Sequence, residues 1–152
     1  MSDSRHDSTV SDQGFSLQIV PRYAEIDQQG VVFNGHYLTW FDEALTGFLD
    51  DVGLAYPDLI ASGHDVVLVH TEIDYLASVR WRDSVRVAVA CERLGSTSFT
   101  VNFGVLRHGA ATQEQIAVRS RSTYVVVSTD DGTKRPIPGP LREALRPSTS
   151  AT

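Results

Sequence analysis

The chain has 152 residues, of which 41% are hydrophobic and 21% charged, and this composition suits one soluble globular domain. Its net charge of −6 argues against a general nucleic-acid binder, which needs a basic surface to neutralise phosphates. No apolar run reaches the roughly 18–20 residues of a membrane span. The N-terminus lacks the apolar region of a secretory signal, and the single cysteine allows no intrachain disulfide, so a cytoplasmic location is the default expectation.

Polar segments without an apolar period occupy residues 1–13 and 147–152. We expect both segments to be disordered tails around one domain at 14–146. The first ordered element should be a strand over residues 15–23, because apolar and polar side chains alternate there.

A long helix is predicted over residues 34–52. Asn34 is a suitable N-cap and Gly53 a suitable C-terminal stop. The apolar residues recur at i, i+3, i+4 and i+7, the spacing of one wide helical face; they are Tyr37, Trp40, Phe41, Ala44, Leu45, Phe48, Leu49 and Val52. This face must be buried against another layer of structure.

The rest of the chain has the alternation typical of strands, with a short turn or helix near 57–62 and a short helix ending at Leu145. Short separators that contain Gly95 and Gly109 join consecutive strands, which implies antiparallel neighbours. We therefore expect an α+β fold, in which one long helix covers one face of a five-stranded antiparallel sheet. The other face should be solvated or should meet a partner subunit.

The segment before the long helix carries a candidate for chemistry. Asp27 lies in a loop that leads directly into the helix, and Gly30 allows a left-handed bend there. A helix N-terminus offers unpaired N–H groups that can stabilise the oxyanion of acyl transfer. A nearby carboxylate can activate water or attack the carbonyl itself. A thioester hydrolase needs these two parts and no metal, although an aspartate in a turn can equally be a simple capping residue.

This segment resembles the 4-hydroxybenzoyl-CoA thioesterase-like branch of the hotdog-fold thioesterases, which includes the acyl-CoA thioesterases associated with the Tol-Pal system. The shared pattern is an Asp, a Gly three residues later, two aliphatic residues, an aromatic residue and then a Tyr on the helix. It is carried here by Asp27, Gly30, Val31, Val32, Phe33 and Tyr37. Residues 40–44, 74–80 and 95–99 are also similar to the family, so the resemblance covers about residues 15–138.

The resemblance implies a hotdog fold, with the sheet wrapped around the central helix, and an acyl-CoA thioesterase without a cofactor. It implies that Asp27 is the nucleophile or general base and that the backbone N–H near Asn34 binds the thioester oxygen. It also implies a homodimer or homotetramer with active sites at a subunit interface. A carrier-protein thioester stays possible as substrate. We expect the following residues to contact the substrate: Gly30, Val31, Val32, Phe33, Gly35, Tyr37 and Val69.

Alternative sites remain open at this stage. Another branch of hotdog thioesterases uses an acid in the middle of the central helix, and Asp42 falls near that place. His64 and His70 should share a strand face, but no third ligand is evident, so we expect no metal. A non-catalytic acyl-CoA-binding domain of the same fold is the alternative to an enzyme.

Overall fold

The computed structural model describes residues 14–109 and 113–146, so the predicted tails at 1–13 and 147–152 lie outside the described residues. The elements in chain order are β1 (Phe15–Ile19), a 3₁₀ helix η2 (Tyr23–Glu25), α2 (His36–Asp51), α3 (Tyr56–Ala61), β2 (His64–Tyr75), β3 (Ser84–Leu94), β4 (Ser98–His108), β5 (Gln115–Ser128) and α4 (Gly139–Leu145).

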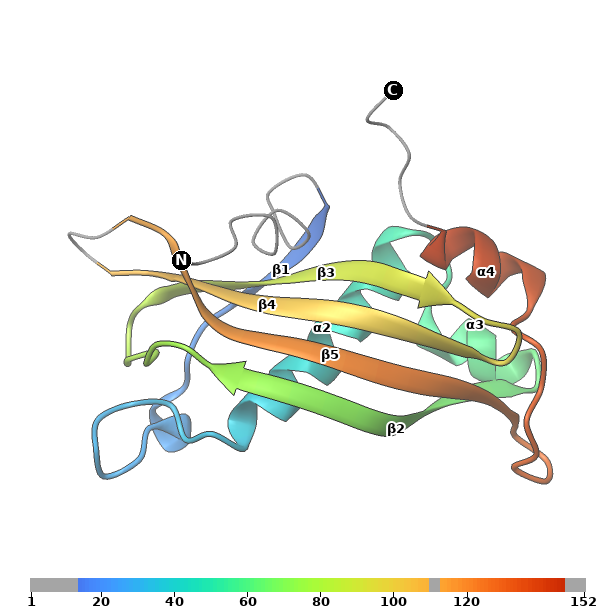
Figure 1. Ribbon diagram of the computed structural model, residues 1–152, viewed down its shortest axis with the longest axis horizontal. Helices are drawn as coiled ribbons and strands as arrows, with labels where there is room; N and C mark the ends of the chain where they lie inside the picture. The colour runs from blue at the N-terminus through green and yellow to red at the C-terminus, as the bar shows by residue number, and fades with distance from the viewer. Residues whose placement is uncertain (1–13, 110–112, 147–152) are drawn as a thin grey trace.

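The five strands form one sheet in the order β1-β3-β4-β5-β2, and every neighbouring pair is antiparallel. Helix α2 runs along one face of this sheet, behind the strands in Figure 1, and packs on β1 and β3. The predicted α+β fold with one long central helix on a five-stranded antiparallel sheet is confirmed.

The hydrophobic core lies between α2 and the sheet. The stripe of apolar residues on α2 supplies Trp40, Phe41 and Ala44, all of them buried, and the Phe41 ring stacks on Phe103 of β4 with centroids 4.9 Å apart. Burial of each large apolar side chain contributes about 1.5–3 kcal/mol relative to exposure. Packing of this face, more than helix propensity, therefore holds α2 on the sheet.

Two predicted boundaries were wrong. The first strand ends at Ile19 and not at residue 23, since Pro21 follows, which has no N–H to donate, and the chain then turns into η2. Helix α2 begins at His36, and its N-cap is Gly35 without a side-chain cap, so Asn34 is not the cap. The carbonyl of Asn34 instead accepts a hydrogen bond from Tyr75 Oη.

A bulge interrupts the pairing of β2 with β5 between Leu68 and His70, and it leaves Val69 without a partner residue. His64 pairs with Ser128 but His70 with Thr123, an odd number of residues away. Because side chains alternate along a strand, the two histidines point to opposite faces, and the prediction that they share one face was wrong.

Candidate active site

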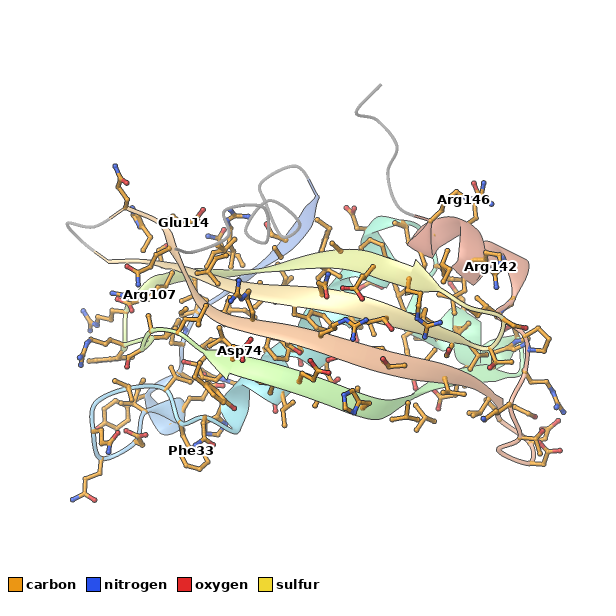
Figure 2. All side chains as sticks on the ribbon, in the orientation of Figure 1. Phe33, Asp74, Arg107, Glu114, Arg142 and Arg146 are labelled. Atoms are coloured by element: carbon orange, nitrogen blue, oxygen red, sulfur yellow. The ribbon has the colours of Figure 1, made fainter. Side chains whose placement is uncertain are left out.

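The loop that carries Asp27, the first turn of α2 and the β2–β3 connection lie at one end of the molecule (Figure 1). Figure 2 shows Phe33 and Arg107 at this end, whereas Arg142 and Arg146 of α4 lie at the opposite end. The sheet thus brings segments 26–35 and 79–83 together, although more than forty residues separate them in the sequence.

Asp27 begins a tight hairpin turn. Its N–H donates to the Val31 carbonyl at 2.8 Å, and its own carbonyl accepts from the Gly30 N–H at 2.9 Å. Gly30 has a φ of 80°, so the predicted left-handed bend is present, and a side chain here would be strained. The half-buried carboxylate of Asp27 accepts the Gln29 N–H at Oδ1 (2.8 Å), and among the described residues no group bonds to its other oxygen. One carboxylate oxygen is therefore available for chemistry.

The residues that follow the hairpin turn are anchored to the connection between β2 and β3. The Val32 N–H donates to the Val79 carbonyl at 2.8 Å, and Val31 bridges to Arg80. The Phe33 N–H closes the base of the loop by donating to the Glu25 carbonyl at 2.9 Å. These backbone bonds restrict the position that Asp27 can take.

Glu25 holds the segment before the hairpin turn in place through a buried carboxylate, and this residue is only 6% exposed. Its Oε1 accepts the Arg22 N–H at 2.8 Å, and its Oε2 accepts the Trp40 indole N–H at 3.0 Å. The loop is thereby tied to the central helix two residues before Asp27. The sequence analysis did not single out Glu25. The signal that could have found it is an acidic residue in the same loop as Asp27, together with the indole of Trp40 on the apolar face of the predicted helix.

The start of α2 presents unpaired backbone donors. The His36 N–H bonds to the Phe33 carbonyl at 3.1 Å, but the N–H groups of Asn34 and Gly35 have no acceptor among the described residues. The partial positive charge of a helix N-terminus adds to the attraction of these groups for an oxyanion. The oxyanion site predicted near Asn34 would have to use these N–H groups, and its role stays a prediction.

Two tyrosines support this helix start. Tyr75, at the end of β2, donates to the Asn34 carbonyl at 3.1 Å, and its ring lies 5.8 Å from the Tyr37 ring. Burial raises the pKa of Tyr37 to about 12; a backbone hydrogen bond with Val79 opposes this shift, and the negative charge of Asp27 adds to it. Tyr75 was also missed, because nothing local to residue 75 indicates a partner 41 residues away.

The other predicted substrate contacts divide into three groups. Phe33, Gly35 and Gly30 are exposed beside Asp27, and Phe33 is 49% accessible. Val32 and Tyr37 are buried in the core, so they support the site from beneath and offer little surface to a ligand in this chain; Val31 is half-buried. Val69 is 56% exposed in the middle of β2, and no strand pairing or β-bridge among the described residues joins it to the loop of Asp27.

The alternative acid, Asp42, lies on the exposed side of α2, six residues after the helix begins. Partial burial raises its pKa, and the neighbouring Glu43 adds to the shift. Asp42 is about 9 Å along the helix axis from His36, the first residue of the helix, given the rise of 1.5 Å per residue. Within residues 14–109 and 113–146, no cluster of three or more His, Cys, Asp or Glu side chains could hold a metal ion, and no helix is long and apolar enough to cross a membrane.

Known proteins resemble this chain in sequence and in fold. The sequence model of the thioesterase superfamily matches residues 29–111, more than half of the chain. The chain is 25% identical to a putative acyl-CoA thioesterase, YneP, of Bacillus subtilis over 113 residues, which cover 74% of this chain and 79% of the relative. It is 24% identical to the acyl-CoA thioesterase YbgC of Haemophilus influenzae over 130 residues, 85% of this chain and 90% of the relative.

A mutant 4-hydroxybenzoyl CoA thioesterase, solved with 4-hydroxybenzoyl CoA, has the same fold. The TM-score is 0.78 at 17% sequence identity, with 86% of this chain and 97% of that chain covered. The predicted resemblance to the hotdog thioesterases is therefore confirmed for the fold. Because the family match covers more than half of the chain, including the whole of α2 and the strands β2, β3 and β4, the chain belongs to the thioesterase superfamily and is a thioester hydrolase.

Proposed function

We propose that the chain hydrolyses acyl-CoA to a free acid and CoA, with Asp27 as nucleophile or general base. The observation that carries this proposal is the pairing of one available carboxylate oxygen on Asp27 with the unpaired N–H groups of Asn34 and Gly35 in the same loop. The acyl-CoA substrate is supported by the names of the relatives in Bacillus subtilis and Haemophilus influenzae.

In the general-base route, Asp27 takes a proton from water, and the resulting hydroxide adds to the thioester carbon. The oxyanion forms against the N–H groups of Asn34 and Gly35, which are already oriented and need no reorganisation. Collapse of the tetrahedral intermediate breaks the C–S bond, and the protonated Asp27 returns its proton to the leaving thiolate. Phe33 and Gly35 border the position of the acyl group.

In the nucleophilic route, the Asp27 carboxylate itself adds to the thioester carbon and expels the thiolate. The mixed anhydride is then cleaved by water to regenerate the aspartate. Both routes use the same oxyanion site. In a single turnover in ¹⁸O-water, label that enters the carboxylate of Asp27 requires the anhydride. Label found only in the released acid favours the general-base route, although an anhydride opened at the acyl carbonyl gives the same result.

The test of the proposal is Asp27→Asn beside Asp42→Asn, assayed by release of free thiol from a panel of acyl-CoAs. Asp27→Asn keeps the shape of the side chain and removes the base, so kcat should fall about 10²–10⁴-fold with KM largely kept. Asp42→Asn should stay close to wild type. Turnover by Asp27→Asn within a few-fold of wild type would reject the assignment, and a loss in Asp42→Asn alone would move the chemistry to the helix acid. Saturable binding without thiol release by the wild type would indicate a non-catalytic binding domain.

We also propose that two copies associate through β2. This strand is an edge of the sheet, since it pairs only with β5, and its middle exposes Val67, Leu68 and Val69. An edge strand with exposed aliphatic side chains and free backbone groups is a template for pairing with another chain. Antiparallel pairing of two such edges would extend the sheet across a homodimer; a homotetramer would need a further interface.

A further inference from the structure

The carbonyl of Asn34, just before α2, is held by the side chain of a residue from β2. Tyr75 Oη donates to this carbonyl at 3.1 Å, and no backbone N–H of the described residues does so. The carbonyl one residue earlier, that of Phe33, has a different donor, the His36 N–H at 3.1 Å. Of these two carbonyls, one is therefore fixed by the local backbone and the other by a tyrosine 41 residues away in the chain.

The same two carbonyls belong to the peptide groups that carry the unpaired donors. The Phe33 carbonyl shares its peptide group with the Asn34 N–H, and the Asn34 carbonyl shares one with the Gly35 N–H. Both peptide groups are trans. Because a trans peptide group is planar, its C=O and N–H bonds point in opposite directions. The hydroxyl that holds the Asn34 carbonyl therefore also sets the direction of the Gly35 N–H.

Tyr75 can hold this carbonyl because its own position is fixed on two sides. It is the last residue of β2, and the N–H of the next residue, Leu76, donates to the Ala117 carbonyl at 2.8 Å. The ring of Tyr75 lies 5.8 Å from the ring of the buried Tyr37. The Tyr37 ring in turn meets the ring of Trp40 at 5.1 Å. The hydroxyl is thus carried on a strand end and on an aromatic cluster that packs into the core.

We propose that Tyr75 is a positioning residue of the thioesterase reaction, which orients the Asn34–Gly35 peptide group so that the Gly35 N–H faces the oxyanion. A donor that is already fixed stabilises the oxyanion without reorganisation as the charge develops. The hydrogen bond from Tyr75 also polarises the peptide group, which makes its N–H a stronger donor. This inference rests on the proposed function and deepens it. Tyr75 acts only through the peptide group, and its hydroxyl keeps its proton in both routes.

The hydrogen bond from Tyr75 also stabilises the start of α2, so a test must distinguish lost orientation from lost stability. Tyr56 provides the matched comparison. Its hydroxyl donates to Asp65 Oδ1 at 2.5 Å and joins α3 to the first residues of β2, whereas Tyr75 is the last residue of that strand. Because hydrogen bonds to charged groups are the stronger ones, Tyr56→Phe should cost at least as much stability as Tyr75→Phe.

The kinetic test is Tyr75→Phe, which removes the hydroxyl and keeps the ring. We expect kcat for acyl-CoA to fall about tenfold with KM nearly unchanged, less than the 10²–10³-fold loss of a whole oxyanion donor, because the Gly35 N–H remains but is no longer held. Tyr56→Phe should keep the wild-type kcat. A wild-type kcat in Tyr75→Phe overturns the inference, as does an equal fall in Tyr56→Phe, which would indicate lost stability. A rise in KM alone also overturns it, because the exposed Tyr75 would then bind the substrate directly.

An infrared measurement tests the orientation independently of turnover. The probes are analogues of the acyl-CoA panel in which CH₂ replaces the thioester sulfur, so that they cannot be hydrolysed, and the carbonyl carbon is ¹³C. Hydrogen bonds from the protein weaken the C=O bond and lower its stretching frequency. This lowering should be smaller in Tyr75→Phe than in the wild type and unchanged in Tyr56→Phe.

The two measurements separate this inference from the proposed function. Wild-type turnover by Asp27→Asn would reject the role of Asp27 and leave the infrared result standing. An unchanged carbonyl frequency in Tyr75→Phe overturns the inference and leaves Asp27 in its role. A wild type that binds none of the analogues overturns both.

Discussion

Glu25→Gln tests whether the buried carboxylate positions the catalytic loop. The native carboxylate accepts two hydrogen bonds, from the Arg22 N–H at 2.8 Å and the Trp40 indole N–H at 3.0 Å. Glutamine has one oxygen that can accept, so one of these donors must face an NH₂ group. The Trp40 indole is buried and cannot turn to water for a replacement. The substitution therefore removes one hydrogen bond whatever rotamer the amide adopts.

The magnitude follows from the type of bond lost. A hydrogen bond to a charged group contributes about 1.5–3 kcal/mol, and removing the buried charge returns part of this by ending its desolvation. We expect a net loss of about 1–2 kcal/mol in the free energy of unfolding. For a chain of this size that corresponds to a fall of roughly 2–8 °C in Tm. Glu72→Gln is the matched control: Glu72 is exposed on β2, and its loss should change stability by less than about 0.5 kcal/mol.

The kinetic consequence distinguishes positioning from mere stability. Glu25 lies two residues before Asp27, and a displacement of about 1 Å in a catalytic group can cost up to 10²-fold in rate. We expect kcat to fall about tenfold at 20 °C, where the variant is still folded, with KM nearly unchanged. Urea unfolding and thiol-release kinetics measure the two effects on the same protein. A destabilised variant with wild-type kcat would show that Glu25 holds the fold but does not position Asp27.

Two further predictions concern the assembly and the response to alkaline pH. Val69→Lys places a charge on the exposed edge of β2 and should convert the proposed dimer to a monomer in light scattering at micromolar concentration. Val20→Lys, at a still more exposed valine away from β2, should leave the dimer intact, and a wild-type monomer would contradict the dimer. Burial raises the pKa of Tyr37 to about 12, and the hydrogen bond to Asp65 raises the pKa of Tyr56 to about 12. Because the unfolded chain releases these protons near pH 10, both tyrosines should lower the free energy of unfolding between pH 10 and 12. The buried Tyr37 should contribute up to about 1.4 kcal/mol per pH unit, and Tyr56, which is close to solvent, should contribute less because water screens its interaction with Asp65. Urea titrations at pH 9, 10 and 11 should show this decline, and Tyr56→Phe should make it shallower; a flat profile would refute it.

The sequence predicted those elements that a local period specifies. The apolar stripe of α2 repeats over four turns, and the alternation in β3, β4 and β5 fixes which face meets the helix. Local signals failed where a distant residue decides the structure. Asn34 has the chemistry of an N-cap, but Tyr75 takes its carbonyl and the helix starts two residues later. The bulge at Val69 has no sequence signature, because it depends on how β2 registers with β5.

The same distinction explains how much of the candidate site could be predicted. Asp27 and Gly30 were accessible because an acid and a glycine at this spacing before a helix are visible in the sequence itself. The groups proposed to bind the oxyanion are backbone N–H donors, which every residue except proline has. Only the fold shows that those of Asn34 and Gly35 find no acceptor within residues 14–109 and 113–146. Glu25 becomes important through an indole 15 residues away, a contact that exists only once α2 packs across the loop. Substitutions in this site should therefore act in two ways: at Asp27 on chemistry with little effect on stability, and at Glu25 on both.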